Sequence, residues 1–71
     1  MTPVSPDLTD RQEQVLLLIG EGHGIREIAR LLGLSEHTVK RHRENGIRAL
    51  GARNQTNAVM LLVRLRDGAV A

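Results

Sequence analysis

The chain has 71 residues, enough for one small domain that buries only part of the surface its unfolded form exposes. It contains no cysteine and no aromatic residue, which excludes disulfide frameworks, thiolate metal sites and the aromatic platforms that stack unpaired nucleic-acid bases. The net charge is +2, but acidic residues prevail in residues 1–34 and basic residues in residues 35–71. This asymmetry favours a localised surface for an acidic partner, although an ordinary solvated face would look the same.

Residues 1–7 contain two prolines and are expected to form a flexible segment ahead of the domain. The capping box TDRQ then predicts the start of a first helix, because Thr9 and Gln12 can each accept a hydrogen bond from the other's backbone N–H. The glycines of GEGHG, residues 20–24, end this helix. Its expected inward face consists of Leu8, Val15, Leu16 and Ile19.

A short second helix is predicted over residues 25–32, with Gly24 as its N-cap. Gly33 suits the left-handed position that ends a helix, and Ser35 suits the cap of the next one. A helix, a short turn beginning with glycine and another helix form a helix-turn-helix signature. The inward stripe of the second helix is expected to be Ile25, Ile28, Ala29 and Leu32.

The third helix, residues 36–50, carries a band of basic side chains opposite its inward positions. In a helix-turn-helix protein this helix lies in the DNA major groove, where Lys and Arg pair with guanine and Glu accepts from cytosine. The candidate base-reading residues are Lys40, Arg41, Glu44 and His37, and the candidate phosphate contacts are Ser35, Thr38, Arg43, Arg53 and Asn54. The alternative is a solvated basic helix with pairs such as Lys40–Glu44.

A fourth helix is predicted from a cap at Asn54 to a point near Arg66, followed by a tail at residues 68–71. One apolar stripe suffices to rest such a helix on a small core, and here Ala58, Leu61, Leu62 and Leu65 would form it. Three surplus apolar residues, Val59, Met60 and Val63, predict an exposed patch and a two-fold homodimer that is weak without DNA. The alternative is a helix that is simply more deeply buried.

The sequence resembles the LuxR-type (GerE-like) helix-turn-helix domain of bacterial transcription regulators, and the resemblance runs from residue 8 to about residue 66. The motifs LTDRQEQVL, EIARLLGLSEHTVKRH and LGARNQTNAV carry it. It implies an all-α, four-helix domain over residues 8–67 that binds DNA as a dimer through the fourth helix. It also implies that Lys40, Arg41 and Glu44 face bases, that Thr38, Arg53 and Asn54 lie near phosphates, and that His42 is structural.

The chain departs from the family pattern at three positions: Gln12 replaces the usual Glu, Ala49 the usual Lys, and Gly46 a branched aliphatic residue. Glycine inside a helix costs about 1 kcal/mol relative to alanine. A missing buried aliphatic side chain could add roughly 2–4 kcal/mol if the space stays empty. We expect Met60 or Leu62 to fill this space and Gly46→Ile to raise the melting temperature.

The sequence therefore predicts a regulator that binds specific double-stranded DNA, with RNA polymerase as a further candidate partner. We expect a cytoplasmic bacterial protein at the nucleoid, since its longest apolar run, residues 58–63, is too short to span a bilayer. Neither catalysis, a cofactor, a metal nor a small-molecule ligand is expected, because His37 and His42 are five residues apart and no third ligand accompanies them. The alternative function is an interaction module that binds RNA polymerase or another regulator without reading DNA.

Overall fold

The computed structural model describes residues 7–70, with side chains described through Gly68. Four helices make up the fold: α1 (Asp10–Gly20), α2 (Ile25–Leu32), α3 (Glu36–Ala49) and α4 (Gln55–Val70). No strand occurs between residues 7 and 70, so the predicted all-α fold is confirmed. Of the segment expected to be flexible, residues 1–7, all but Asp7 lies outside the described residues.

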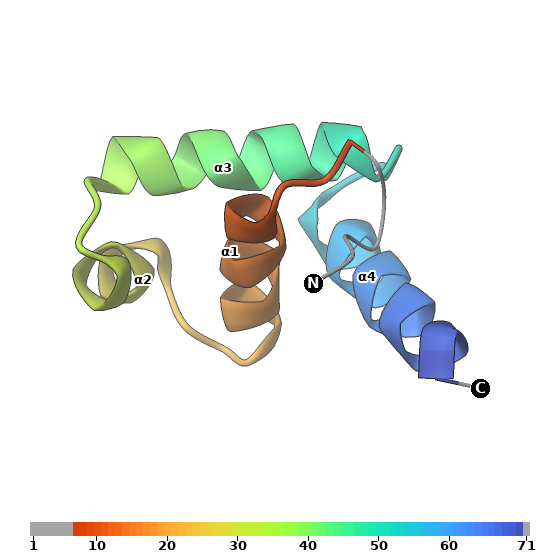
Figure 1. The fold of residues 1–71 in the computed structure, drawn as a ribbon. Helices are drawn as coiled ribbons and strands as arrows, with labels where there is room; N and C mark the ends of the chain where they lie inside the picture. Colours follow the sequence, from red (N-terminus) through yellow and green to blue (C-terminus); the bar gives the residue numbers. More distant parts are fainter. Residues whose placement is uncertain (1–6, 71) are drawn as a thin grey trace.

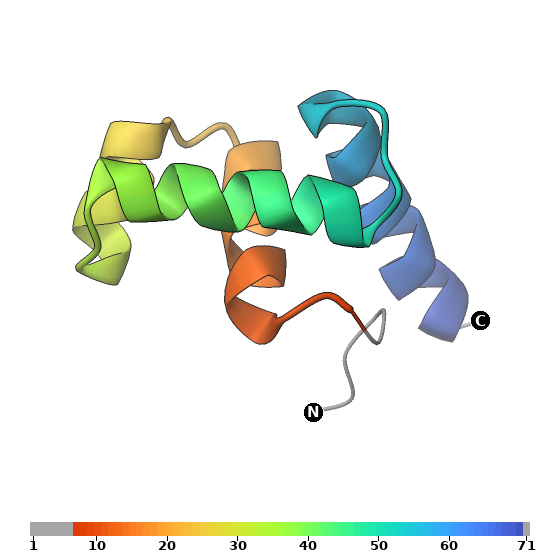
Figure 2. The same ribbon diagram turned by 90° about the horizontal axis from the view of Figure 1, so that it is seen from above.

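The helices are arranged so that α3 lies across one side of the molecule and the other three lie beneath it (Figure 1). Seen from that side, α3 is in the foreground and no other helix covers it (Figure 2). The central element is α1, which contacts each of the other helices, whereas α2 and α4 do not touch. The outer face of α3 is therefore free to meet a partner.

The core consists of two clusters of buried side chains on either side of α1. Val15 belongs to one cluster and Leu16, its neighbour in sequence, belongs to the other, because successive helical residues point about 100° apart. Each cluster holds four fully or almost fully buried residues: Leu8, Leu16, Ala58 and Leu62 in the first, and Val15, Ile28, Ala29 and Val39 in the second. The inward face predicted for α1 is confirmed, although Ile19 is only partly buried.

The capping box expected at the start of α1 is present. The Gln12 backbone N–H donates to Thr9 Oγ1, and the Thr9 backbone N–H donates to Gln12 Oε1, each over 3.1 Å. The Gln12 side chain thus accepts the Thr9 backbone N–H as a glutamate would, which explains how the chain tolerates its departure from the family pattern at this position.

Gly46 is buried, but the prediction that Met60 or Leu62 fills the space beside it is wrong. A Cβ atom added at Gly46 would lie 2.9 Å from Leu16 Cδ1 and 3.4 Å from Gln12 Cβ, both on α1. The space is thus filled by α1, whereas Met60 on α4 is largely exposed. Gly46 lets α1 and α3 approach closely, so a larger residue there would overpack the core instead of filling a cavity.

The inward face of α4 differs in part from the predicted stripe. Ala58 and Leu62 are fully buried and Leu61 is partly buried, but Leu65 is 45% exposed and does not belong to the core. The helix also continues to Val70, about one turn past the end expected near Arg66, so residues 68–70 continue α4. Beyond Leu62, every residue through Gly68 is exposed, and this end of α4 projects from the body of the molecule (Figure 1).

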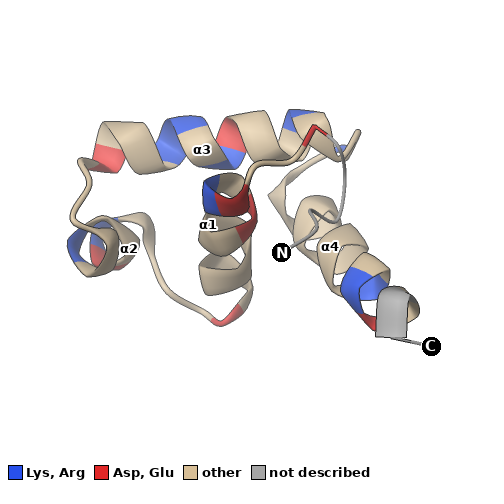
Figure 3. Ribbon diagram, in the orientation of Figure 1, with Lys and Arg blue, Asp and Glu red and all other residues tan. Residues whose placement is uncertain are grey.

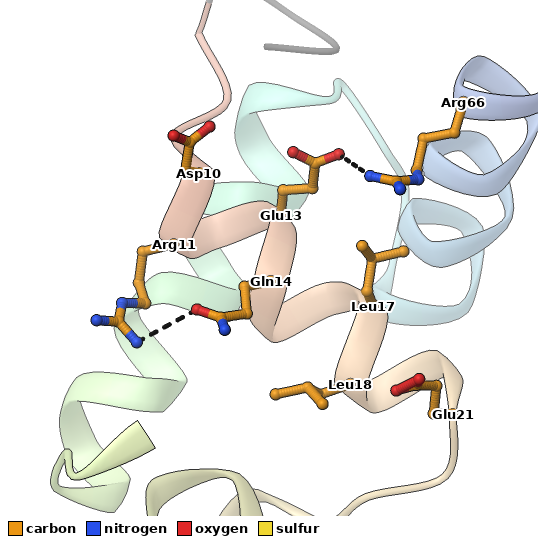
Figure 4. Close-up of a pocket in the computed structure, with 8 residues that line it drawn as sticks. All are labelled: Asp10, Arg11, Glu13, Gln14, Leu17, Leu18, Glu21 and Arg66. Carbon is orange, nitrogen blue, oxygen red and sulfur yellow. Dashed lines mark hydrogen bonds and ion pairs between the residues drawn. The ribbon is translucent and has the colours of Figure 1, made fainter. Parts of the chain in front are cut away.

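An ion pair that the sequence analysis did not anticipate joins α1 to the projecting end of α4. Arg66 Nη1 donates to Glu13 Oε1 over 2.6 Å, and the two side chains point toward each other across the edge of a pocket (Figure 4). The Glu13 side chain is only 9% exposed, whereas that of Arg66 is 46% exposed. The pair thus consists of a buried carboxylate and a guanidinium that stays partly in solvent.

Candidate nucleic-acid interface

The turn between α2 and α3 sets the start of α3. Gly33 has a φ of 69°, and the backbone N–H of Leu34 donates to Ala29 O over 2.9 Å, so Leu34 turns back against the core. Ser35 then caps α3: its Oγ accepts the Thr38 backbone N–H over 3.0 Å and its hydroxyl donates to Thr38 Oγ1 over 2.9 Å. The predicted helix-turn-helix is confirmed, with two hydroxyl groups at the positive end of the α3 dipole.

All four candidate base-reading residues lie on the outer side of α3. His37, Lys40, Arg41 and Glu44 are exposed, and their spacing of three, four and seven residues puts them on one helical face. Val39 is fully buried on the opposite face. The expected separation of a buried side from a polar side is therefore present, and the polar side is the one that no other helix covers (Figure 2).

The charges on this face are largely unpaired. Within residues 7–68, neither Lys40 nor Arg41 has an acidic group within 4.0 Å, and the Lys40–Glu44 pair considered above does not form. Glu44 instead lies 3.8 Å from Arg43 Nη2. The basic segments of α3 lie between and beyond two acidic ones (Figure 3), and the unpaired Lys40 and Arg41 can attract an anionic partner.

Two further residues of α3, His42 and Arg43, lie at the border between its buried and exposed sides. Both are partly buried, and 25% of the Arg43 side chain is exposed. Such a residue can pack its aliphatic stem along the helix and keep its charged head in solvent. This position suits the expected phosphate contact of Arg43 and the structural role expected for His42.

The remaining phosphate candidates, Arg53 and Asn54, lie in the loop before α4 and are exposed. Asn54 Oδ1 accepts the Asn57 backbone N–H over 2.8 Å, and Asn57 Oδ1 accepts the Arg53 backbone N–H over 3.0 Å. These two hydrogen bonds confirm Asn54 as the cap of α4 and fix the backbone of Arg53. The Arg53 guanidinium has no ion-pair partner among residues 7–68.

Sequence reasoning missed Arg48 as part of this surface. Arg48 is exposed, and it lies four residues after Glu44 and seven after Arg41, which extends the same face by one turn. The periodicity that identified Lys40 and Arg41 also predicts Arg48.

The candidate dimer surface is a shallow apolar depression on α4. Met60 is 58% exposed and Val63 is 44% exposed, whereas Val59 is partly buried against Gly20 of α1. Arg64 and Asp67 line the same depression. The patch therefore consists mainly of Met60 and Val63, with one basic and one acidic side chain at its rim.

The structure also bears on metal binding and on membrane insertion. In the described part of the chain, no three His, Cys, Asp or Glu side chains lie together in a way that could hold a metal ion. Within residues 7–70, no helix combines the length and the apolar character needed to cross a bilayer.

Comparison with known sequences gives a consistent picture. The family model of bacterial regulatory proteins, luxR family, matches residues 6–62. The spore germination protein GerE of Bacillus subtilis is 37% identical over 62 residues, which cover 87% of this chain and 84% of GerE. No solved structure matches the chain significantly.

Other relatives are much longer than the part they share with this chain. The transcriptional activator protein CarR of Pectobacterium carotovorum is 38% identical over 58 residues, and the transcriptional regulatory protein LnrK of Bacillus subtilis is 43% identical over 58 residues. Each alignment covers 82% of this chain but only 24% of CarR and 26% of LnrK. The chain thus spans about a quarter of the length of these two relatives.

Proposed function

This chain belongs to the luxR family of bacterial regulatory proteins, and from this we propose that it binds specific double-stranded DNA with α3 in the major groove. The family consists of transcription regulators and not of enzymes. Lys40, Arg41 and Glu44 contact base edges in this proposal, with His37 one turn earlier. The phosphate contacts come from Ser35, Thr38, Arg43, Arg53 and Asn54.

The observation that carries the proposal is the uncovered face of α3. An α-helix fits the major groove, and α3 presents long donors opposite its buried side, with no acid of residues 7–68 within 4.0 Å of Lys40 or Arg41. Glu44 supports base reading, because a carboxylate that faced phosphates would repel them, whereas one that faces a cytosine can accept from N4. The Ser35 cap supports phosphate binding at the start of the same helix.

We further propose that two copies bind together through Met60 and Val63 of α4, with Val59 at the edge of the contact. Both residues are well exposed, and apolar patches rimmed by polar groups mark interaction sites. Arg64 and Asp67 at the rim have opposite charges, so a two-fold axis can bring each one near the other in the second copy. The small size of the patch implies weak association without DNA. A contact with RNA polymerase stays a prediction.

The decisive experiment selects bound sites from random duplex DNA and then measures the dissociation constant for the selected site. We expect a site with two related halves. Affinity should fall roughly 100-fold between about 50 and 200 mM salt, if Arg43 and Arg53 of both copies release phosphate counterions. An interaction module that does not read DNA would select no sequence and would show a change of less than a few-fold.

Single substitutions then test the assigned face. Lys40→Ala and Arg41→Ala should each weaken binding to the selected site by about ten-fold and relax the sequence preference at one position. Arg11→Ala is the matched control, because Arg11 is exposed on α1 and its removal changes the net charge equally. Equal losses in all three variants would mean that only overall charge matters and that α3 does not read bases.

A further inference from the structure

The end of α4 is attached to the rest of the molecule by very few contacts. Residues 63–68 are all exposed, and the Glu13–Arg66 ion pair is the one side-chain hydrogen bond that joins this segment to another helix within residues 7–68. Val63, which belongs to the proposed dimer patch, lies in this segment. The direction in which the patch faces therefore depends on how α4 is held against α1.

Besides the core cluster that Leu16 shares with Ala58 and Leu62, two contacts between α1 and α4 oppose a change in this direction. At one, Val59 packs so closely on Gly20 that a Cβ atom at Gly20 would lie 2.7 Å from Val59 Cγ1. At the other, Glu13 binds Arg66. The two contacts are seven residues apart on each helix, or about 10 Å, so together they oppose rotation of α4 about either point.

Helix α1 also packs closely against α3, the helix proposed to read DNA bases. Leu16 and Gln12 of α1 fit against Gly46 of α3 with no room for a Cβ atom. Ile47, Ala49 and Leu50 near the end of α3 pack against the core cluster that contains Ala58 and Leu62 of α4, and residues 63–68 of α4 are exposed. The orientation of the projecting end of α4 relative to α3 is thus transmitted through α1.

We propose that Glu13 and Arg66 are positioning residues that set the distance and angle between the two reading helices of the dimer. The inference rests on the proposed function, because it requires two copies joined through α4. In such a dimer a small rotation of α4 moves the partner's α3 along the duplex and changes the half-site spacing that both copies can occupy. The ion pair thereby determines which spacing is preferred.

The chemistry of the pair suits this role. The carboxylate of Glu13 is largely removed from water and therefore needs a charged or hydrogen-bonding partner. The Arg66 side chain is about half exposed, so solvent partly screens its attraction to Glu13. Removal of Arg66 would leave the Glu13 carboxylate buried without its partner and would also lower the free energy of unfolding, so a variant that removes the charge of Glu13 itself is needed beside it.

The test uses duplexes built from the selected half-site, with the two halves placed at the preferred spacing and one base pair closer or farther apart. For the wild type, the ratio of affinities between preferred and altered spacing is measured. Arg66→Met, which keeps the length of the side chain without its charge, should lower this ratio about five-fold. Its affinity for a duplex with one half-site should change less than two-fold, and Arg66→Lys should restore most of the ratio.

Glu13→Gln is the second variant, because it retains a hydrogen-bond acceptor for Arg66 with almost no change in shape. It should lower the spacing ratio less than Arg66→Met does, while circular dichroism shows unchanged helix content. A ratio that stays at the wild-type value in both variants overturns the inference and leaves the proposed function standing. If the wild type selects no duplex site, both proposals fail; if it selects a site but shows no spacing preference, the inference fails and the proposal that α3 reads DNA stands.

Discussion

Gly46 and Leu16 share one small volume where α1 crosses α3, and the size of each residue limits the other. Leu16 is fully buried, so its side chain cannot move into solvent to make room. Protein interiors are close-packed, and added methyl groups force neighbouring side chains out of their preferred rotamers. The glycine is therefore a consequence of the close approach of two helices, although its position inside a helix costs about 1 kcal/mol.

Substitution of Gly46 should destabilise the protein in proportion to the added volume. Gly46→Ile should lower the free energy of unfolding by about 1–3 kcal/mol and the melting temperature by roughly 5–20 °C, measured by far-ultraviolet circular dichroism. Gly46→Ala should be close to neutral, because its gain in helix propensity is offset by the contact with Leu16. Gly68→Ala is the control: nothing lies within 4 Å of its added Cβ, so it should stabilise by about 0.5 kcal/mol. A higher melting temperature for Gly46→Ile would contradict the packing described here.

Helix α3 combines two roles at its first turn, since Ser35 both caps the helix and lies where a phosphate is expected. Ser35→Asp separates these roles. Aspartate caps as well as serine and its charge suits a helix start, so the melting temperature should stay equal or rise. The same charge would repel a phosphate, and affinity for the selected duplex should fall about ten-fold. Ser35→Ala should instead lower stability by about 1 kcal/mol. Undiminished affinity in Ser35→Asp would mean that no phosphate binds there.

The start of each helix and the ends of α1, α2 and α3 could be predicted because they depend on local chemistry. Thr9, Ser35 and Asn54 form caps with residues only three positions away, and Gly33 adopts the left-handed conformation that its lack of a side chain permits. The exposed row of α3 was predictable for the same reason, since it follows from helical periodicity alone. Apart from Arg48 and the end of α4, what the sequence did not reveal depends on contacts between helices. The filling of the space at Gly46, the exposure of Leu65 and the Glu13–Arg66 pair all require knowledge of how α1 crosses α3 and α4.

At the scale of the whole molecule, the polar face of α3 and the apolar patch of α4 allow separate tests of reading and assembly. Met60→Glu should prevent association through α4, because it places a charge in the centre of the patch. Binding to a duplex with two half-sites should weaken about ten-fold, and binding to one half-site should be unchanged. Leu31→Glu is the matched control, since Leu31 on α2 and Met60 are both 58% exposed. Equal effects of the two substitutions would exclude α4 as the contact between copies.

The two core clusters also differ in when they can form as the polypeptide leaves the ribosome. Every residue of the cluster around Val15 lies at or before Val39 in the sequence, so these side chains can pack together while the rest of the chain is still being synthesised. Leu8 and Leu16 can meet their partners Ala58 and Leu62 only after α2, α3 and the first half of α4 have been synthesised. A nascent chain therefore carries half of its interior uncovered until the final helix arrives, and it is during this interval that it is most exposed to aggregation and to proteases.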